Sequence, residues 1–151
     1  MVEIIEYEEK YFQDFKKLNL EWLDKYQLTE SHDLLILNNP QKMILERGGF
    51  IWLAKAEYEI IGSAAIVNEG EGIFQLAKLS VTQSWQGNRI GQLLIETCLL
   101  KVRAVGAKKI VLFSNHQLTK ALSLYKKYGF KHIEVVESPF LTSDVKMELV
   151  L

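Results

Sequence analysis

Residues 86–91 read Gln-Gly-Asn-Arg-Ile-Gly and stand between a stretch typical of a strand and a stretch typical of a long helix. A loop in this position presents successive main-chain N–H groups beside the positive end of the helix dipole, which is a favourable place for phosphate oxygens. Gly87 and Gly91 carry no Cβ, so a pyrophosphate could approach the backbone closely. Taken alone, the segment fits an ordinary structural turn better than a binding loop, because such turns are common.

Other chemistry is poorly supported by the residue pattern. The three histidines, His32, His116 and His132, lie far apart without the spacing of metal ligands, so no metal site is expected. Cys98 falls on the apolar side of the predicted long helix and is expected in the core. No G-x-x-x-x-G-K-[ST] run is present, which argues against an ATP-binding P-loop.

The composition limits the class of protein. The 151 residues fit one domain, with 18 basic against 19 acidic side chains, so no basic surplus is available for nucleic acid or for an anionic membrane. The first residues lack the features of a signal peptide, and no apolar run reaches membrane-spanning length. A single cysteine suits a reducing compartment. We therefore expect a cytoplasmic protein of one domain, residues 1–151, without nucleic-acid or membrane partners.

Periodicity predicts the elements that would position the loop. Apolar residues at helical spacing indicate an amphipathic first helix, and alternation indicates several strands. Strand, long helix and strand in sequence imply a right-handed crossover and a parallel pair. The predicted fold class is α+β (α/β), a mixed, mostly antiparallel sheet with helices on both faces. The expected strands are 2–6, 50–57, 60–67, 73–82, 109–113, 131–136 and 144–151, and the expected helices are 12–26, two short ones between 31 and 48, 88–105 and 118–128.

The strand at 73–82 changes the phase of its alternation. Its larger apolar side chains stand at even positions first, Phe74 and Leu76, and at odd positions later, Leu79 and Val81. One continuous apolar face would need an extra residue near 77–78, which is a β-bulge. The alternative is a strand that is covered on both faces, for which the phase has no meaning.

A second segment makes the first more informative. Residues 121–130 read Ala-Leu-Ser-Leu-Tyr-Lys-Lys-Tyr-Gly-Phe, and Asn115 precedes them. With 86–91, this segment resembles the GNAT superfamily of acetyl-CoA-dependent N-acetyltransferases, whose marks are Q/R-x-x-G-x-G/A and A-x-x-L-Y-x-x-x-G-F. The order of elements resembles the family over nearly the whole chain, and the expected bulge falls where the family's fourth strand bends.

The resemblance implies roles for matching positions. Acetyl-CoA would be the donor, with its pyrophosphate on the loop and its pantetheine arm beside the main chain of the bent strand. Tyr125 stands where the family has the general acid that protonates the departing thiolate; core packing is its alternative role. The segment from Trp22 to Asp33 lies where such folds build the wall of the acceptor site. The residues implied in cofactor binding are Leu79, Ser80, Val81, Gln86, Gly87, Asn88, Arg89, Ile90, Gly91, Gln92 and Asn115.

Two positions depart from the family pattern. Arg89 stands where the middle glycine is usual, and it could bond phosphate oxygens or crowd the loop. Gln75 stands where many relatives have a glutamate as general base, and an amide cannot take that proton. The proton could pass instead to Glu30, Asp33, Glu69 or Glu71 through water, or to solvent itself.

The sequence therefore predicts transfer of an acetyl group from acetyl-CoA to a primary amine, of a small-molecule acceptor, by direct attack in a ternary complex. Three other readings stay open: a non-catalytic CoA-binding or partner-binding module, a transferase of another acyl group, and transfer to an alcohol. The sequence identifies neither the amine nor the oligomeric state, for which a homodimer is one option.

Overall fold

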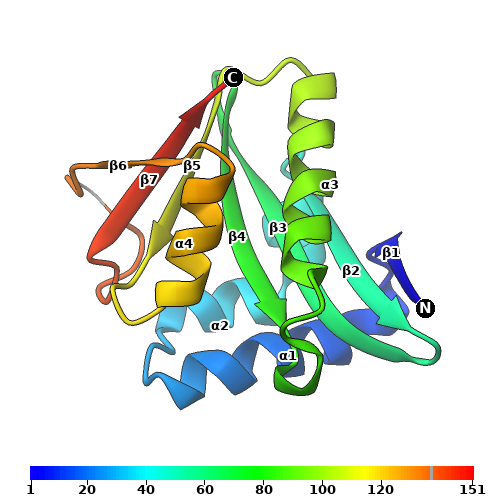
Figure 1. Ribbon diagram of the computed structural model, residues 1–151. Helices are drawn as coiled ribbons and strands as arrows, with labels where there is room; N and C mark the ends of the chain where they lie inside the picture. Colours follow the sequence, from blue (N-terminus) through cyan, green and yellow to red (C-terminus); the bar gives the residue numbers. More distant parts are fainter. Residues whose placement is uncertain (137) are drawn as a thin grey trace.

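The computed structural model describes residues 1–136 and 138–151, and within them the strands form one mixed sheet (Figure 1). The strand order is β1-β2-β3-β4-β5-β7-β6, and all neighbouring strands are antiparallel except β4 and β5. The last strand in the chain therefore inserts between β5 and β6. The strands are β1 (Val2–Glu6), β2 (Phe50–Ala56), β3 (Glu59–Gly70), β4 (Ile73–Val81), β5 (Lys109–Ser114), β6 (Lys131–Ile133) and β7 (Val145–Val150).

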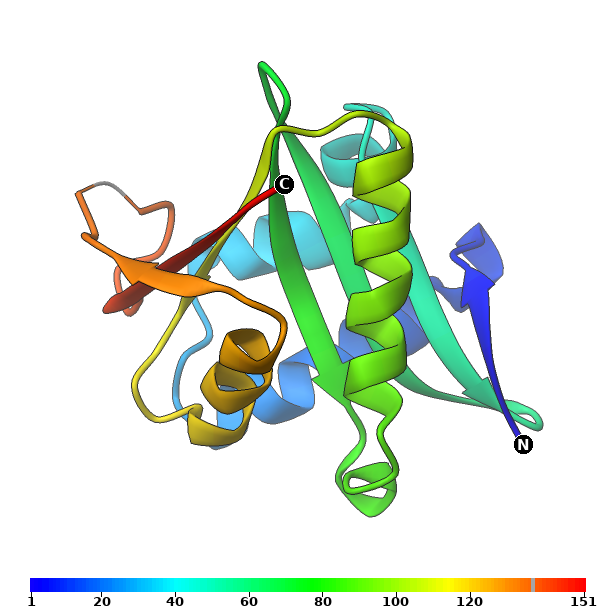
Figure 2. The ribbon, with the colours of Figure 1, turned by 45° about the horizontal axis from the view of Figure 1, so that its top comes forward.

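Helices cover both faces of this sheet, as predicted (Figure 2). The helices α3 and α4 pack on one face with a core that includes Leu94, Val102 and Met147. The helices α1 and α2 pack on the other face with a core that includes Phe15 and Leu37. The helices are α1 (Phe12–Lys25), α2 (Ser31–Asn38), the π-helical turn Gln41–Leu45, α3 (Ile90–Ala104) and α4 (Thr119–Lys127), with short 3₁₀ turns at Glu9–Tyr11 and Gln83–Trp85.

Most element boundaries differ from the sequence prediction by one or two residues, and three of the differences are described here. The strand β3 continues to Gly70 because its polar end still pairs with β4, with Asn68 opposite Phe74. The strand β6 ends at Ile133 rather than 136. The last strand begins at Val145 rather than 144, because the carboxylate of Asp144 accepts a hydrogen bond from the main-chain N–H of His116 instead of continuing the strand.

The parallel strands β4 and β5 pair only at their beginnings. Their register runs from Ile73 opposite Lys109 to Gln75 opposite Val111, and no further pair is present among the described residues. Beyond Gln75, β4 stays bound to β3, and β5 stays bound to β7. The two strands therefore diverge and leave one edge of β4 free.

The predicted β-bulge is present where the strands diverge. Ala77 lies opposite Ala65, but Ser80 lies opposite Ser63, so two residues of β4 face one residue of β3. The first of them, Lys78, has a positive φ of 53°. An extra residue of this kind bends a strand and restores its apolar face, which explains the change of phase in the sequence.

A buried polar network holds the bulge. The main-chain oxygen of Lys78 accepts a hydrogen bond from Ser63 Oγ at 2.7 Å, and Ser63 Oγ in turn accepts one from Asn19 Nδ2 at 3.1 Å. The ammonium of Lys78 forms an ion pair with Asp33 of α2, and the two side chains are only 4% and 3% exposed. Burial lowers the pKa of Lys78, and the charge of Asp33 opposes that effect. A buried charge without a partner costs free energy, so each of these two charges needs the other. The ion pair therefore holds α2 against the bulge.

Replacement of Asp33 should show how much this pair contributes. Asp33→Asn leaves the ammonium of Lys78 buried without its counter-charge, so the free energy of unfolding should fall by about 3–5 kcal/mol, measured by chemical denaturation. The exposed Glu21→Gln on α1 is the control and should change it by less than about 0.5 kcal/mol. The double variant Asp33→Leu/Lys78→Met should recover most of the loss, because it removes both charges. A loss in Asp33→Asn no larger than in the control would contradict this account.

Candidate active site

The loop between β4 and α3 has the geometry of an anion cradle. After a 3₁₀ turn, the side chains of Gln86 and Asn88 bind back to the loop, to the main-chain oxygens of Val81 at 3.1 Å and Trp85 at 2.9 Å. The first main-chain hydrogen bond of the helix runs from Leu93 N to the oxygen of Arg89 at 3.2 Å. Among the described residues, the main-chain N–H groups of residues 87–92 find no acceptor. These consecutive donors at a helix N-terminus are suited to phosphate oxygens.

Positions 87, 89 and 91 of the loop differ in backbone conformation and in the space around them. Gly87 has φ +87°, and the space where a Cβ would stand is open. Arg89 keeps a left-handed backbone, φ 61° and ψ 21°, as the cap of α3, and its side chain is exposed. A Cβ on Gly91 would lie 3.3 Å from Leu124 Cδ2 of α4. Gly91 thus permits the close packing of α3 against α4, a role that the loop motif alone did not indicate.

The remaining members of the predicted cradle are held by packing and by α4. Ile90 is buried in the core beneath the loop. Gln92 Oε1 accepts a hydrogen bond from Lys127 Nζ of α4 at 3.2 Å. The start of α3 is therefore fixed both from below and from the neighbouring helix.

The segment Leu79, Ser80 and Val81 lies on β4 after the bulge. Ser80 and Val81 pair with β3, while the edge that faces β5 has no partner strand among the described residues. The Ser80 hydroxyl lies 3.4 Å from the main-chain oxygen of Leu18 of α1. An extended group could therefore lie along the free edge of β4 in the manner of an added strand.

A small cavity of about 70 Å³ lies in the gap between the diverging strands. Its lining includes Gln75 and Lys78 of β4 and Asn115, which follows β5. Asn115 donates from Nδ2 to the oxygen of Thr142 at 2.7 Å, and its Oδ1 accepts from Gln117 N at 3.0 Å. The side chain thus organises the turn into α4, and its contact with a cofactor stays a prediction.

Tyr125 lies on α4 at the edge of the core. Its side chain is 8% exposed, and its ring centre is 5.9 Å from that of Phe130. Burial raises the pKa of Tyr125, and the proximity of Cys98 adds to the effect. A hydroxyl with a raised pKa keeps its proton at neutral pH, as a general acid must. The packing and the proposed acid role are both compatible with this position.

Two of the four candidate carboxylates are already engaged in structural contacts. Asp33 pairs with Lys78, and its other oxygen accepts from Glu30 N at 2.9 Å. Glu30 accepts from the main-chain N–H groups of Leu141 at 2.6 Å and Thr142 at 2.9 Å. Although burial acts to raise the pKa of Glu30, these hydrogen bonds outweigh it and the pKa is lowered. Neither carboxylate is free to accept a proton from a substrate.

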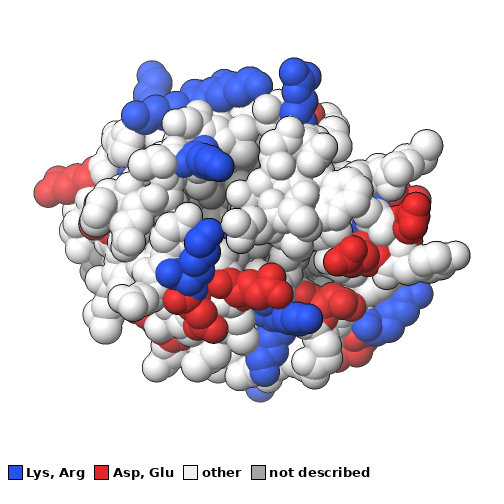
Figure 3. All heavy atoms as spheres, turned by 60° about the horizontal axis from the view of Figure 1, so that its bottom comes forward, with Lys and Arg blue, Asp and Glu red and all other residues white. Residues whose placement is uncertain are grey.

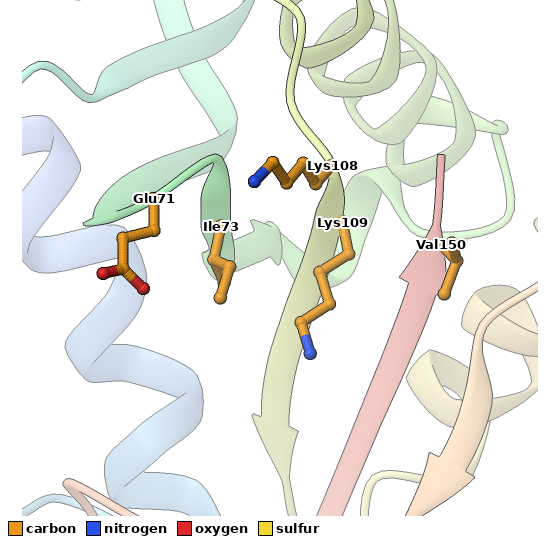
Figure 4. Close-up of a pocket in the computed structure, with 5 residues that line it drawn as sticks. All are labelled: Glu71, Ile73, Lys108, Lys109 and Val150. Atoms are coloured by element: carbon orange, nitrogen blue, oxygen red, sulfur yellow. The ribbon is translucent and has the colours of Figure 1, made fainter.

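A larger cavity of about 900 Å³, which we call the acceptor hollow, opens on the side of the sheet that carries α2. Gln75 and Phe113 line both this hollow and the small cavity. Glu69 and His32 also line the hollow. Glu71 instead borders an adjoining depression where β4 and β5 begin (Figure 4). The sequence analysis considered His32 only when it argued against a metal site and gave it no other role; its place within the predicted acceptor wall, Trp22 to Asp33, was the available signal.

The end of the molecule at which β4 finishes carries both signs of charge (Figure 3). Lys and Arg side chains predominate along its upper margin, and Asp and Glu side chains gather in its lower half. Within residues 1–136 and 138–151, no group of three or more His, Cys, Asp or Glu side chains is placed to hold a metal ion. None of the helices described there is long and apolar enough to cross a membrane.

Substitutions at Arg89 should separate its side chain from its backbone. Arg89→Gly relieves a left-handed conformation that is unfavourable for residues with a Cβ, so the free energy of unfolding should rise by up to about 1 kcal/mol. Arg89→Ala keeps the strain and should leave stability nearly unchanged. If the guanidinium holds phosphate, both variants should bind CoA more weakly than wild type at low salt, with a smaller difference at high salt, in titration calorimetry. Tighter binding by Arg89→Gly would show instead that the side chain crowds the loop.

Comparison with known proteins agrees with this geometry. Residues 47–132 match the family model of the acetyltransferase (GNAT) domain. The uncharacterized N-acetyltransferase YvbK of Bacillus subtilis (strain 168) is 29% identical over 131 residues, 84% of this chain and 83% of the relative. The crystal structure of a GNAT-family acetyltransferase from Staphylococcus aureus Mu50 has a TM-score of 0.91 at 21% identity. This match covers 100% of this chain and 99% of the Staphylococcus chain. The PaiA N-acetyltransferase of Thermoplasma acidophilum, in complex with coenzyme A, has a TM-score of 0.78 at 17% identity. This match covers 100% of this chain and 99% of the PaiA chain. The predicted family and fold are confirmed: this chain belongs to the GNAT family of acetyltransferases.

Proposed function

We propose that residues 1–151 act as one acetyltransferase domain that moves an acetyl group from acetyl-CoA to a primary amine of a small molecule. The observation that carries this proposal is the row of unpaired N–H groups at 87–92 beside the free edge of β4. Phosphates and a pantetheine arm need these two features next to each other. The complex of the similar PaiA protein with coenzyme A supports a donor based on CoA.

The donor would lie across the loop and into the gap between β4 and β5. Its pyrophosphate would accept hydrogen bonds from the N–H groups of residues 87–92, with Arg89 beside it. Its arm would pair with the main chain of residues 79–81, and the thioester would reach the bulge. Main-chain N–H groups at the bulge would then polarise the carbonyl.

The reaction would be a direct attack in a ternary complex. The amine nitrogen bonds to the acetyl carbon, the C–S bond breaks, and the thiolate of CoA receives a proton from the Tyr125 hydroxyl. The new amide nitrogen loses one proton to solvent, and the Tyr125 phenolate takes one back from solvent. The raised pKa of Tyr125 means that the hydroxyl is protonated when the sulfur leaves. The amine would arrive through the acceptor hollow, because Gln75 and Phe113 border both that hollow and the small cavity.

The attacking amine must first lose a proton, because an alkyl ammonium has a pKa of about 10. Gln75 cannot take that proton, and Asp33 and Glu30 are engaged elsewhere. His32 and Glu69 line the acceptor hollow together with Gln75. A neutral imidazole has a ring nitrogen that can accept a proton, which is what a general base needs. We assign this role to His32, acting directly or through water.

Removal of the Tyr125 hydroxyl tests the proposed reaction. In an assay of CoA thiol released from acetyl-CoA with a panel of amines, Tyr125→Phe should lower kcat by about 10²–10⁴-fold, because the proton is needed only as the C–S bond breaks. Acetyl-CoA affinity, measured by calorimetry, should stay within about twofold of wild type.

Tyr58→Phe is the matched control, since Tyr58 is exposed at the tip of the β2–β3 hairpin. It should have wild-type kinetics. Full activity of Tyr125→Phe would assign Tyr125 to packing alone. Failure of the wild-type protein to bind acetyl-CoA at millimolar concentration would overturn the proposed function.

The pH dependence of the same assay tests the role of His32. His32→Gln should lower kcat/KM at pH 7 by at least about 10²-fold, and the difference should fade as pH approaches the amine's own pKa, where the free amine needs no base. Glu69→Gln is the comparison variant and should follow the wild-type profile. If neither variant differs from wild type and activity climbs steadily toward the amine pKa, solvent takes the proton.

A further inference from the structure

The acceptor hollow has an excess of positive charge among the described residues that line it. Three cationic side chains border it: Arg47 from the turn before β2, Lys109 from β5 and Lys146 from β7. Glu69 is the one carboxylate among the described lining residues. These cations come from segments far apart in the sequence, so the sequence alone does not show that they share a cavity.

The pairing of these cations leaves two of them available. Lys109 Nζ lies 3.4 Å from a carboxylate oxygen of Glu148, which offsets its charge. Among the residues that the structure describes, Arg47 and Lys146 form no ion pair. Lys146 Nζ lies 5.3 Å from the ring centre of Phe113, which, like Gln75, borders both cavities. An ammonium without an ion-pair partner among residues 1–136 and 138–151 therefore lies close to the place where the two cavities meet.

The remaining wall of the hollow is largely apolar. Ile36 and Met43 contribute from the α2 side, and Val67 and Val111 contribute from the sheet. Cations next to an apolar wall are less screened by water than cations on an open surface, so their attraction for an anion is stronger there. The same field disfavours a ligand that carries several positive charges.

We propose that the acceptor is an amine that also carries an anionic group, a carboxylate or a phosphate, together with an apolar body. This inference rests on the proposed function and names its substrate class. The anion would bind near Arg47 and Lys146, the apolar body would contact the hydrophobic wall, and the amine would point to Gln75 and the thioester. Polyamines and aminoglycosides, which are polycations, would be poor acceptors.

Matched acceptors that differ in charge test the proposal. We would measure kcat/KM by thiol release for phenylalanine against phenylalaninamide, for histidine against histamine, and for phosphoethanolamine against ethanolamine. The anionic member should be favoured by at least about tenfold in one pair or more, and the pair identifies carboxylate or phosphate. The amine of phenylalaninamide is less basic than that of phenylalanine, so more of it is unprotonated at neutral pH. The fraction of free amine alone would therefore favour phenylalaninamide over phenylalanine.

Variants of the two unpaired cations should remove that preference. Arg47→Gln or Lys146→Gln should raise KM for the anionic acceptor by about tenfold and leave acetyl-CoA affinity unchanged. Lys17→Gln, on the exposed side of α1, is the matched control and should keep the wild-type preference. Equal or better turnover of the uncharged or cationic members in all pairs would overturn this inference while the proposed function stands.

A binding measurement separates the remaining outcomes. Calorimetric titration of the CoA-loaded protein with the same amines should show binding of the anionic members and its loss in Lys146→Gln. If anionic amines bind in this way and no thiol is released from acetyl-CoA with any amine, the proposed function fails and the assigned ligand class stands. If no anionic amine binds or reacts, the ligand class is wrong.

Discussion

The buried ion pair between Lys78 and Asp33 is the contact on which the geometry of the site depends. The bulge gives Lys78 a positive φ, and the ammonium then meets the carboxylate on α2. Ser63 holds the main-chain oxygen of the same residue. A regular strand could have continued its pairing with β5 past Gln75 and closed the gap. The bulge and the pair thus keep β4 turned away from β5, and a pair so deeply buried stabilises only while both partners are present.

The same network of polar contacts extends from the bulge to the segment that precedes β7. Glu30, three residues before Asp33, binds the main chain of Leu141 and Thr142, and Asn115 binds the oxygen of Thr142. The segment before β7 is therefore tied both to α2 and to the end of β5. The small cavity and the larger hollow therefore meet at a wall that these hydrogen bonds hold in place.

The loop before α3 combines a glycine-like backbone with a charged side chain. Arg89 has the left-handed conformation that glycine adopts freely, at a cost of about 1–2 kcal/mol for a residue with a Cβ. Strained residues of this kind are concentrated at functional sites. Open space remains where a Cβ on Gly87 would stand, so Arg89 adds a charge to the loop without filling that space.

The sequence by itself determined most of the elements and the family, because these depend on local periodicity and on two short motifs. A phase change within one strand indicated the bulge as one of two interpretations, and the structure decided between them. The sequence also showed that Gln75 leaves the usual base position without a carboxylate. It could not show that Asp33 pairs with Lys78, that Gly91 serves helix packing, or that Arg47 and Lys146 share a cavity. Those relations join residues far apart in the chain, and a charged side chain does not reveal its partner until the packing of the whole fold brings the two together.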